Sequence, residues 1–151
     1  MNESSVRELT ESPEEYHDRV KGLCAALRSD RLDGTLVFNP DHIFWLTGFQ
    51  TIGYFTFQAL FITPDQHVVL VSRTVNQPLA RINPIINSFV AIWDTEIGIE
   101  ALTNVLNQSS RTHGKLGLET DSNNFTINDY QFLTSHLQSS VVPWNYDYQK
   151  F

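Results

Sequence analysis

Short apolar, β-prone segments alternate with helical segments along most of this 151-residue chain. The segments expected to be strands are residues 35–38, 55–63, 67–72, 88–93, 115–118 and 141–142. Pro64-Asp65 lies between the second and third of them and predicts a turn, so these two strands are expected to pair as an antiparallel hairpin. Strands separated by helices form a sheet with helices packed on it. The alternation therefore predicts a single α/β domain with a mixed six-stranded sheet flanked by helices.

The first helix is expected to follow a polar segment, residues 1–11, which we expect to be mobile. Ser12 is suited to cap the helix, Pro13 fits its first position, and Glu15 is placed to close a capping box. The helix should run to about Ser29. Its buried face follows three- and four-residue steps and consists of Val20, Leu23, Cys24 and Leu27.

Further helices are expected at residues 75–82, 96–106 and 126–137. Pro78 is expected to interrupt the first of these. Asp94 or Thr95 is expected to cap the second, which has the apolar face Ile99, Leu102, Val105 and Leu106. Thr126 is expected to open the third with a capping box, and its apolar face would be Ile127, Tyr130, Leu133 and Leu137.

Residues 39–60 are rich in aromatic side chains and carry one formal charge, Asp41. Gly48 and Gly53 allow the backbone to bend, so we interpret residues 44–58 as a loop that carries aromatic residues and runs into the second strand. Such a loop can contact a ligand or a partner chain. The alternative is that its aromatic residues simply fill the core. The spacing of these residues fits both interpretations.

Charge and composition exclude several classes of function. The formal net charge is −7 and the ten basic residues are scattered, so the chain offers no basic stripe for nucleic acid. No segment approaches the apolar length of a membrane span, and the amino terminus lacks an apolar signal region, which predicts a cytoplasmic protein that does not bind membranes. Cys24 is the only cysteine, so an internal disulfide is excluded.

Residue types and spacings alone reveal no active site. The five histidines lack the spacing of a metal-binding helix, and neither a nucleophile elbow nor a glycine-rich phosphate loop is present. Glu119 and Asp121 follow an expected strand, where carboxylates can hold a hard cation, but two carboxylates need further oxygen ligands. We therefore predict no catalytic residue, no metal site and no cofactor for this chain.

Several ordered motifs resemble the amino-terminal domain of the creatinase, prolidase and aminopeptidase P superfamily. Residues 45–49 (WLTGF), followed by residues 53–60 (GYFTFQAL), are similar to its aromatic-Leu-Thr-Gly-aromatic segment. Residues 32–34 (LDG) resemble the family's entry to its first strand, and residues 117–119 (GLE), followed by Tyr130, resemble a later segment. The resemblance extends from about Glu14 to Pro143.

The resemblance implies that residues 12–151 form a mixed sheet with flanking helices, reminiscent of ribonuclease H folds. In such proteins this domain precedes a separate pita-bread domain, which binds two divalent metal ions through Asp, Asp, His, Glu and Glu ligands. Nothing in this sequence matches that ligand set, and the chain ends where the linker to that domain would begin. The resemblance thus implies a domain that is not a hydrolase by itself.

In the resembled family this domain supports assembly and lends loop residues to a neighbouring subunit. The resemblance thereby indicates a homodimer, or a partner catalytic domain. The candidate substrate-contact or interface residues are Tyr54, Phe55, Thr56, Phe57, Gln58 and Arg73. Creatinase-like members have an aromatic residue and an arginine at the positions of Tyr54 and Thr56, and a threonine cannot grip a carboxylate in the bidentate manner of arginine. This difference favours the peptidase or ectoine-hydrolase-like branch over a creatine-like substrate.

Two other functions stay open from the sequence. The chain can be a free-standing module that binds a small molecule or a protein through the aromatic loop at residues 44–58. It can also be a small enzyme whose site has no recognisable motif.

Overall fold

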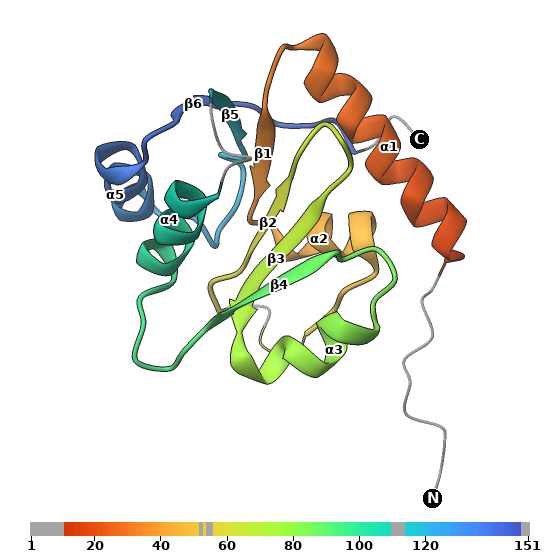
Figure 1. The fold of residues 1–151 in the computed structure, drawn as a ribbon, viewed down its shortest axis with the longest axis horizontal. Coiled ribbons are helices and arrows are strands. Elements are labelled where there is room, and N and C mark those ends of the chain that lie inside the picture. Colours follow the sequence, from red (N-terminus) through yellow and green to blue (C-terminus); the bar gives the residue numbers. More distant parts are fainter. Residues whose placement is uncertain (1–10, 52, 54–55, 110–113, 149–151) are drawn as a thin grey trace, which may run out of the picture.

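The computed structural model describes residues 11–51, 53, 56–109 and 114–148, and a six-stranded sheet forms its centre (Figure 1). The strands are β1 (Gly34–Val37), β2 (Ala59–Ile62), β3 (Val68–Arg73), β4 (Ser88–Ile92), β5 (Lys115–Leu118) and β6 (Ser140–Pro143). Their order across the sheet is β4-β3-β2-β1-β5-β6. The predicted α/β domain with a mixed six-stranded sheet is confirmed.

Strand directions bring most of the connections of interest to one edge of the sheet. β2 is antiparallel to both β1 and β3, which confirms the predicted hairpin, while β3–β4, β1–β5 and β5–β6 are parallel pairs. The carboxyl ends of β1, β3, β4, β5 and β6 therefore lie beside the amino end of β2. We call this side of the sheet the carboxyl edge.

Helices pack on the two faces of the sheet and enclose two apolar cores. α1 (Pro13–Ser29), α2 (Pro40–Thr47) and α3 (Gln77–Ile82) contribute to one core, and α4 (Gly98–Gln108) and α5 (Ile127–His136) contribute to the other. A short 3-10 turn, η1 (Thr74–Asn76), joins β3 to α3. Figure 1 shows α4 and α5 side by side, away from α1. The domain is thus a three-layer α/β structure.

The first helix begins and ends where the sequence predicts. The Ser12 hydroxyl accepts a hydrogen bond from the Glu15 backbone N–H at 3.3 Å, and Pro13 occupies the first turn. The Glu15 carboxylate accepts from Arg19 one turn later, at 3.4 Å. The predicted apolar face is buried and consists of Val20, Leu23, Cys24 and Leu27.

The aromatic loop predicted at residues 44–58 is wrong for residues 44–47, which belong to the helix α2 (Pro40–Thr47). The Asn39 side chain caps this helix by accepting from the Asp41 N–H at 3.0 Å. Gly48 ends it with a left-handed backbone, φ 72°, which glycine adopts without steric cost. β2 is shorter than predicted and begins at Ala59, so residues 56–58 belong to the connection before it.

Two predicted helix starts are also corrected. Pro78 lies in the first turn of α3, where its missing N–H costs no hydrogen bond, so it begins the helix and does not interrupt it. α4 begins at Gly98 without a side-chain cap from Asp94 or Thr95. The Glu96 carboxylate instead accepts from the Trp93 N–H at 3.0 Å, which closes a turn before the helix.

The predicted face of α5 is only partly buried. The capping box at Thr126 is present as predicted, and Leu133 is fully buried. Ile127 and Tyr130, however, are 77% and 40% exposed. Because α5 lies beside α4 at the margin of the domain, one side of it is covered and the rest faces solvent (Figure 1).

None of the helices in the described part of the chain is both long and apolar enough to cross a membrane. The amino-terminal segment that we expect to be mobile is residues 1–11. Residues 1–10 of it lie outside the described residues.

Candidate functional site

The predicted site residues that the structure describes, Thr56, Phe57, Gln58 and Arg73, come from segments at the carboxyl edge. Tyr54 and Phe55 lie outside the described residues. Thr56 is half-buried, and its hydroxyl donates to the Gly53 carbonyl at 2.7 Å, which stabilises a local turn. Phe57 packs against the second core, where Gly98 of α4 leaves room for its ring. The structure thus gives Thr56 and Phe57 structural contacts of their own.

Arg73 is the last residue of β3, the strand between β2 and β4. Its guanidinium donates to the exposed Asp94 carboxylate at 3.2 Å, so it links the ends of the adjacent strands β3 and β4. An exposed ion pair of this kind contributes little to stability. Arg73 does not line the cavity described next.

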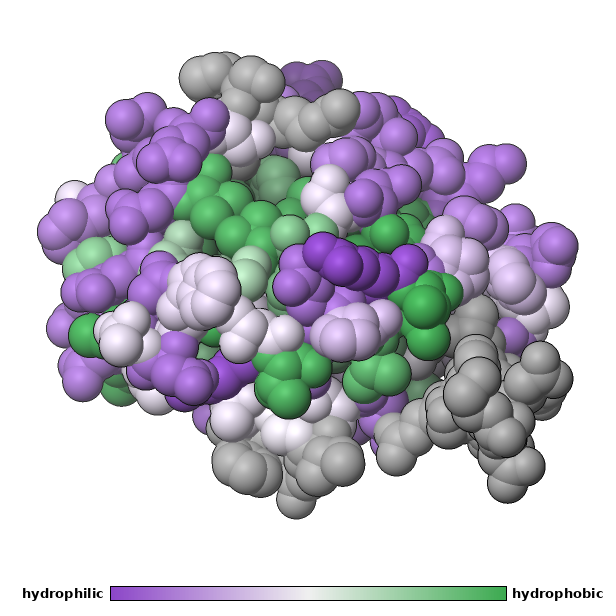
Figure 2. All heavy atoms as spheres, turned by 60° about the horizontal axis from the view of Figure 1, so that its bottom comes forward, coloured by the Kyte–Doolittle hydropathy of each residue, from purple (hydrophilic) through white to green (hydrophobic). Residues whose placement is uncertain are grey.

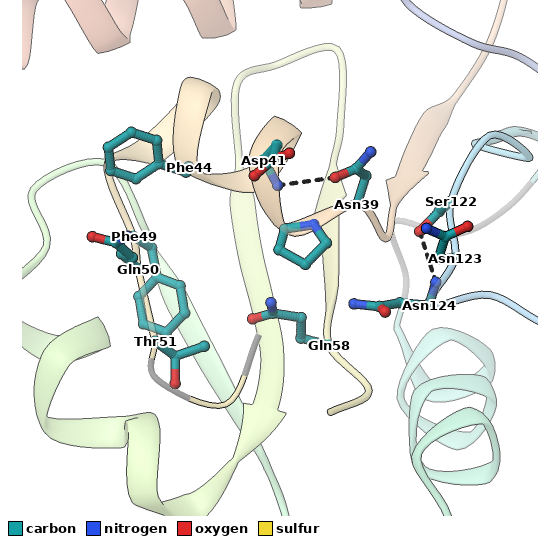
Figure 3. A pocket seen from close by; sticks show the side chains of 11 residues that line it. Asn39, Asp41, Phe44, Phe49, Gln50, Thr51, Gln58, Ser122, Asn123 and Asn124 are labelled. Carbon is teal, nitrogen blue, oxygen red and sulfur yellow. Dashed lines mark hydrogen bonds between the residues drawn. The ribbon is translucent and has the colours of Figure 1, made fainter. Parts of the chain in front are cut away.

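A cavity of about 560 Å³ opens at the carboxyl edge, beneath the start of α2 (Figure 3). Its walls come from four segments: the start and middle of α2, the connection after α2, the residue before β2, and the turn after β5. The lining residues are Asn39, Pro40, Asp41, Phe44, Phe49, Gln50, Thr51, Gln58, Ser122, Asn123 and Asn124. Loops at the carboxyl ends of strands are where α/β sheets commonly bind ligands.

Gln58 is the candidate that the structure does bring into this cavity. Its side chain is 2% exposed, and its carbonyl oxygen has no hydrogen-bond partner among the described residues. An unsatisfied buried polar group costs about 1–3 kcal/mol. Figure 3 shows its carboxamide among the lining side chains, with that of Asn124 pointing toward it. The position immediately before β2 holds Gln58 between two neighbouring strands.

The other lining groups are mostly neutral and polar. Thr51 donates to the Asn76 side chain at 2.8 Å, and the Ser122 hydroxyl accepts from the Asn124 N–H at 3.1 Å. Phe44 and Phe49 supply apolar surface. Asp41 is the single formal charge among the described lining residues, which include no lysine, arginine or histidine. The cavity is therefore suited to amides and hydroxyls rather than to anions.

Glu119, which the sequence suggested as a possible cation ligand, has a structural role. Its buried carboxylate accepts hydrogen bonds from the backbone N–H groups of Phe38 and Asn39, the latter at 2.9 Å, and from the His42 ring. These contacts tie the end of β5 to the end of β1 and the start of α2. Asp121 is exposed. The two carboxylates are thus not combined into one site.

Part of the aromatic segment forms core contacts, as one of the two interpretations proposed. Phe49 is buried, and Trp45 packs on the first core with the Arg19 guanidinium 4.7 Å from its ring centre. Tyr148 from the carboxyl-terminal segment stacks on the His42 ring at 3.9 Å. Burial raises the pKa of the Tyr148 phenol above its ordinary value, and the nearby Glu119 carboxylate adds to that rise.

Within the described residues, no three histidine, cysteine, aspartate or glutamate side chains are grouped to hold a metal ion. The dinuclear centre implied by the sequence resemblance does not fit these residues, because the one buried carboxylate, Glu119, is committed to backbone N–H groups and His42.

Asp41 and the segment at residues 122–124 line the cavity but carry no sequence motif. The signal that was available is positional, since each follows a strand whose carboxyl end lies at the same edge.

Comparisons with known proteins place this fold. The model of the creatinase/prolidase N-terminal domain matches residues 19–147. A proline dipeptidase structure from Streptococcus agalactiae is 18% identical, covers 89% of this chain and 98% of that chain, and has a TM-score of 0.72. The N-terminal domain of Xaa-Pro dipeptidase from Lactobacillus brevis is 15% identical, with coverages of 81% and 90% and a TM-score of 0.67.

A longer structure matches over part of its length. Recombinant prolidase from Thermococcus sibiricus is 16% identical with a TM-score of 0.66, and the match covers 85% of this chain but 34% of that chain. No curated protein matches the sequence.

Proposed function

Because the chain belongs to the creatinase/prolidase N-terminal domain family, we propose that it is the non-catalytic amino-terminal domain of a metal-dependent Xaa-Pro dipeptidase-like hydrolase. The observation that carries the proposal is the family match over residues 19–147, which includes every strand and the whole sheet edge. The partial coverage of the Thermococcus prolidase supports it, since this domain corresponds to about a third of that chain.

The chemistry of the described residues is consistent with a non-catalytic role. Glu119 and His42 satisfy each other and the backbone, so they support the sheet edge instead of presenting a reactive group. The two divalent metal ions of the resembled family would belong to a separate catalytic domain. In this proposal the present domain positions that domain or its neighbour and needs no cofactor of its own.

We propose that assembly uses the β3–β4 end of the carboxyl edge. Three large apolar side chains are mostly exposed on the segments that follow these two adjacent strands: Val75 is 76% exposed, Trp93 63% and Ile97 61%. Figure 2 views the molecule from the end where α3 lies and shows apolar side chains exposed among hydrophilic ones there. Exposed apolar groups that gather on one region are typical of interaction sites. We call Val75, Trp93 and Ile97 the apolar group.

The same assembly would bring the connection before β2 close to a neighbouring subunit. Thr56 and Phe57 precede β2 at the carboxyl edge, and Arg73 ends β3, the strand between β2 and β4. These residues, with Tyr54 and Phe55 of the same sequence segment, are the candidates for contact with that subunit. Their proposed role is to shape the substrate site of a partner, as the sequence resemblance implies.

The test is the solution mass of the chain by light scattering as a function of concentration. We expect a dimer. Its dissociation constant should rise at least about tenfold in the Trp93→Ser, Ile97→Ser variant, because each substitution reduces the apolar area that dimerisation buries. Ile127→Ser is the control, because Ile127 is also mostly exposed but begins α5, the helix that joins β5 to β6 at the other end of the sheet from β3 and β4. A wild-type chain that is monomeric throughout contradicts the self-association proposal.

A second measurement tests the non-catalytic role. The chain is incubated with Xaa-Pro dipeptides and Mn²⁺ or Zn²⁺, and we expect no hydrolysis above that of the metal alone. Hydrolysis that copurifies with the folded chain would contradict this proposal and favour a small enzyme with an unrecognised site.

The free-standing binding module is the second candidate function. The buried Gln58 carboxamide oxygen, which has no partner among the described residues, favours it, because Gln58 lines a cavity of about 560 Å³. Both functions can use the same cavity.

A further inference from the structure

We propose that the cavity beneath α2 binds an uncharged or cationic amide, specifically the amino-terminal part of a peptide chain, and discriminates against a free carboxylate. This deepens the proposed function, on which it rests only for the choice of a peptide as the source of the amide. The cavity is formed by this domain alone, so binding requires neither a partner subunit nor a catalytic domain.

The cavity has the size and the composition of a small-ligand site. Its volume of about 560 Å³ falls inside the usual range of roughly 300–1,000 Å³ for such sites. Phe44 and Phe49 provide apolar walls, and the amides of Asn39, Gln50 and Asn123 also line the cavity. A few polar groups set against apolar surface fix the orientation of a ligand.

Gln58 points to the chemistry of the occupant. It is held at the start of a central strand and buried, yet its oxygen has no partner among the described residues. A carboxamide donates through its nitrogen and accepts through its oxygen, so it is complementary to a peptide group, which does the same. In the present orientation the oxygen is enclosed by protein, and a half-turn of the carboxamide exchanges its oxygen and its nitrogen. Gln58 can therefore present either its amide nitrogen or its amide oxygen to a peptide ligand.

The charge of the cavity decides which part of a peptide it accepts. Asp41 is the one formal charge on the described lining residues, and the chain carries a net charge of −7. A ligand carboxylate would find no cation there and would be repelled, whereas an amino-terminal ammonium group is attracted to Asp41. The attraction is modest because Asp41 is exposed. The preferred ligand thus has a free amino terminus and an amide in place of the carboxylate.

Four compounds separate the contributions: Ala-Ala-amide, N-acetyl-Ala-Ala-amide, Ala-Ala and N-acetyl-Ala-Ala. Each is titrated into the ¹⁵N-labelled chain, and the side-chain amide signals of Gln58 and Gln50 are followed by NMR. We expect Ala-Ala-amide to bind most tightly, by roughly two- to fivefold over its acetylated form, which is the size of an exposed ion pair. N-acetyl-Ala-Ala, the only anion, should bind most weakly.

Two variants assign the effects to residues. Gln58→Leu should weaken Ala-Ala-amide binding about tenfold, the loss expected for a buried hydrogen-bonding group. It should leave the melting temperature unchanged or higher, because it removes a buried amide without a partner, so lost binding cannot be attributed to unfolding. Asp41→Asn should abolish the preference for the free amino terminus. Gln108→Leu on the exposed end of α4 is the matched control and should bind like the wild type.

Three results would overturn the inference: no signal shifts with any compound, in which case solvent is the only occupant; equal binding of the amide and the free carboxylate; or unchanged binding in Gln58→Leu. None of these results depends on oligomeric state. A chain that dimerises but takes no amide rejects this inference alone, and a monomer that binds Ala-Ala-amide rejects the assembly proposal alone.

Discussion

Replacing Glu119 tests whether this carboxylate supports the carboxyl edge of the sheet. Glu119→Ala would leave the backbone N–H groups of Phe38 and Asn39 and the His42 ring without their acceptor. An unsatisfied buried group costs about 1–3 kcal/mol, and Phe38 is buried while the other two are partly buried. We therefore expect the free energy of unfolding to fall by roughly 3–4 kcal/mol, with a melting temperature lower by about 10 °C.

Glu119→Gln should cost far less, and this difference is the sharper part of the prediction. Both backbone N–H groups are bonded to one carboxylate oxygen and His42 to the other. A glutamine can keep its oxygen toward the backbone and offer its NH₂ to the ring nitrogen of a neutral histidine, so every group retains a partner. The expected loss is about 1 kcal/mol or less, because only the assistance of the charge is removed.

The assay is urea unfolding followed by circular dichroism, with thermal melting as a second reading. Asp121→Ala is the control, since Asp121 is exposed and lies two residues away, and its free energy of unfolding should change by less than about 0.5 kcal/mol. A Glu119→Ala variant within about 1 kcal/mol of the wild type would refute the argument. So would a Glu119→Gln variant as unstable as Glu119→Ala.

Two further predictions concern the packing of the cores. Gly98→Ala would place a Cβ 2.3 Å from the Phe57 ring, so it should destabilise the chain by about 1–3 kcal/mol in urea unfolding, despite the better helix propensity of alanine. The loss should shrink when Phe57 is also changed to Ala. If the free-energy losses of the two substitutions simply add, the contact is contradicted. Burial raises the pKa of the Cys24 thiol to about 11, so the folded state disfavours the thiolate. The free energy of unfolding should therefore keep its full value below pH 9 and fall between about pH 9 and 11, where the unfolded chain ionises and the folded chain does not. Cys24→Ala should show a shallower fall over that interval, and an equal dependence on pH in both proteins would contradict the assignment.

The sequence predicted the sheet well because its strands are local signals. Each strand is a short β-prone run with punctuation such as Pro64-Asp65 beside it, and β1 and β2 are buried along their whole length. The helix α2 was missed for a related reason. Asn39, Pro40 and Gly48 are helix start and stop signals, but the eight residues they enclose are short and rich in aromatics, so the run was interpreted as a loop.

The cavity could not be predicted because it has no local signature. Its lining residues come from segments far apart in the sequence, from Asn39 after β1 to Asn124 after β5. The sequence around Gln58 also does not reveal that its carboxamide oxygen lacks a partner among the described residues, because this depends on which groups surround it in the fold. Likewise, the sequence position of Glu119 after a strand suggests a cation ligand. Only the folded structure shows that its carboxylate accepts a hydrogen bond from the Phe38 backbone N–H instead.

Glu119 and Gln58 are two buried polar groups at the carboxyl edge whose hydrogen-bond environments differ. Glu119 lies one residue after β5 and Gln58 one residue before β2, on either side of β1, and both are 2% exposed. The charged group, which would be costly to leave alone, is saturated by two backbone N–H groups and a histidine. The neutral amide is left without a partner for its oxygen among the described residues and lines a cavity. Satisfying the charged group preserves the stability of the fold, whereas the proposed ligand site relies on the neutral amide, whose unsatisfied oxygen costs less.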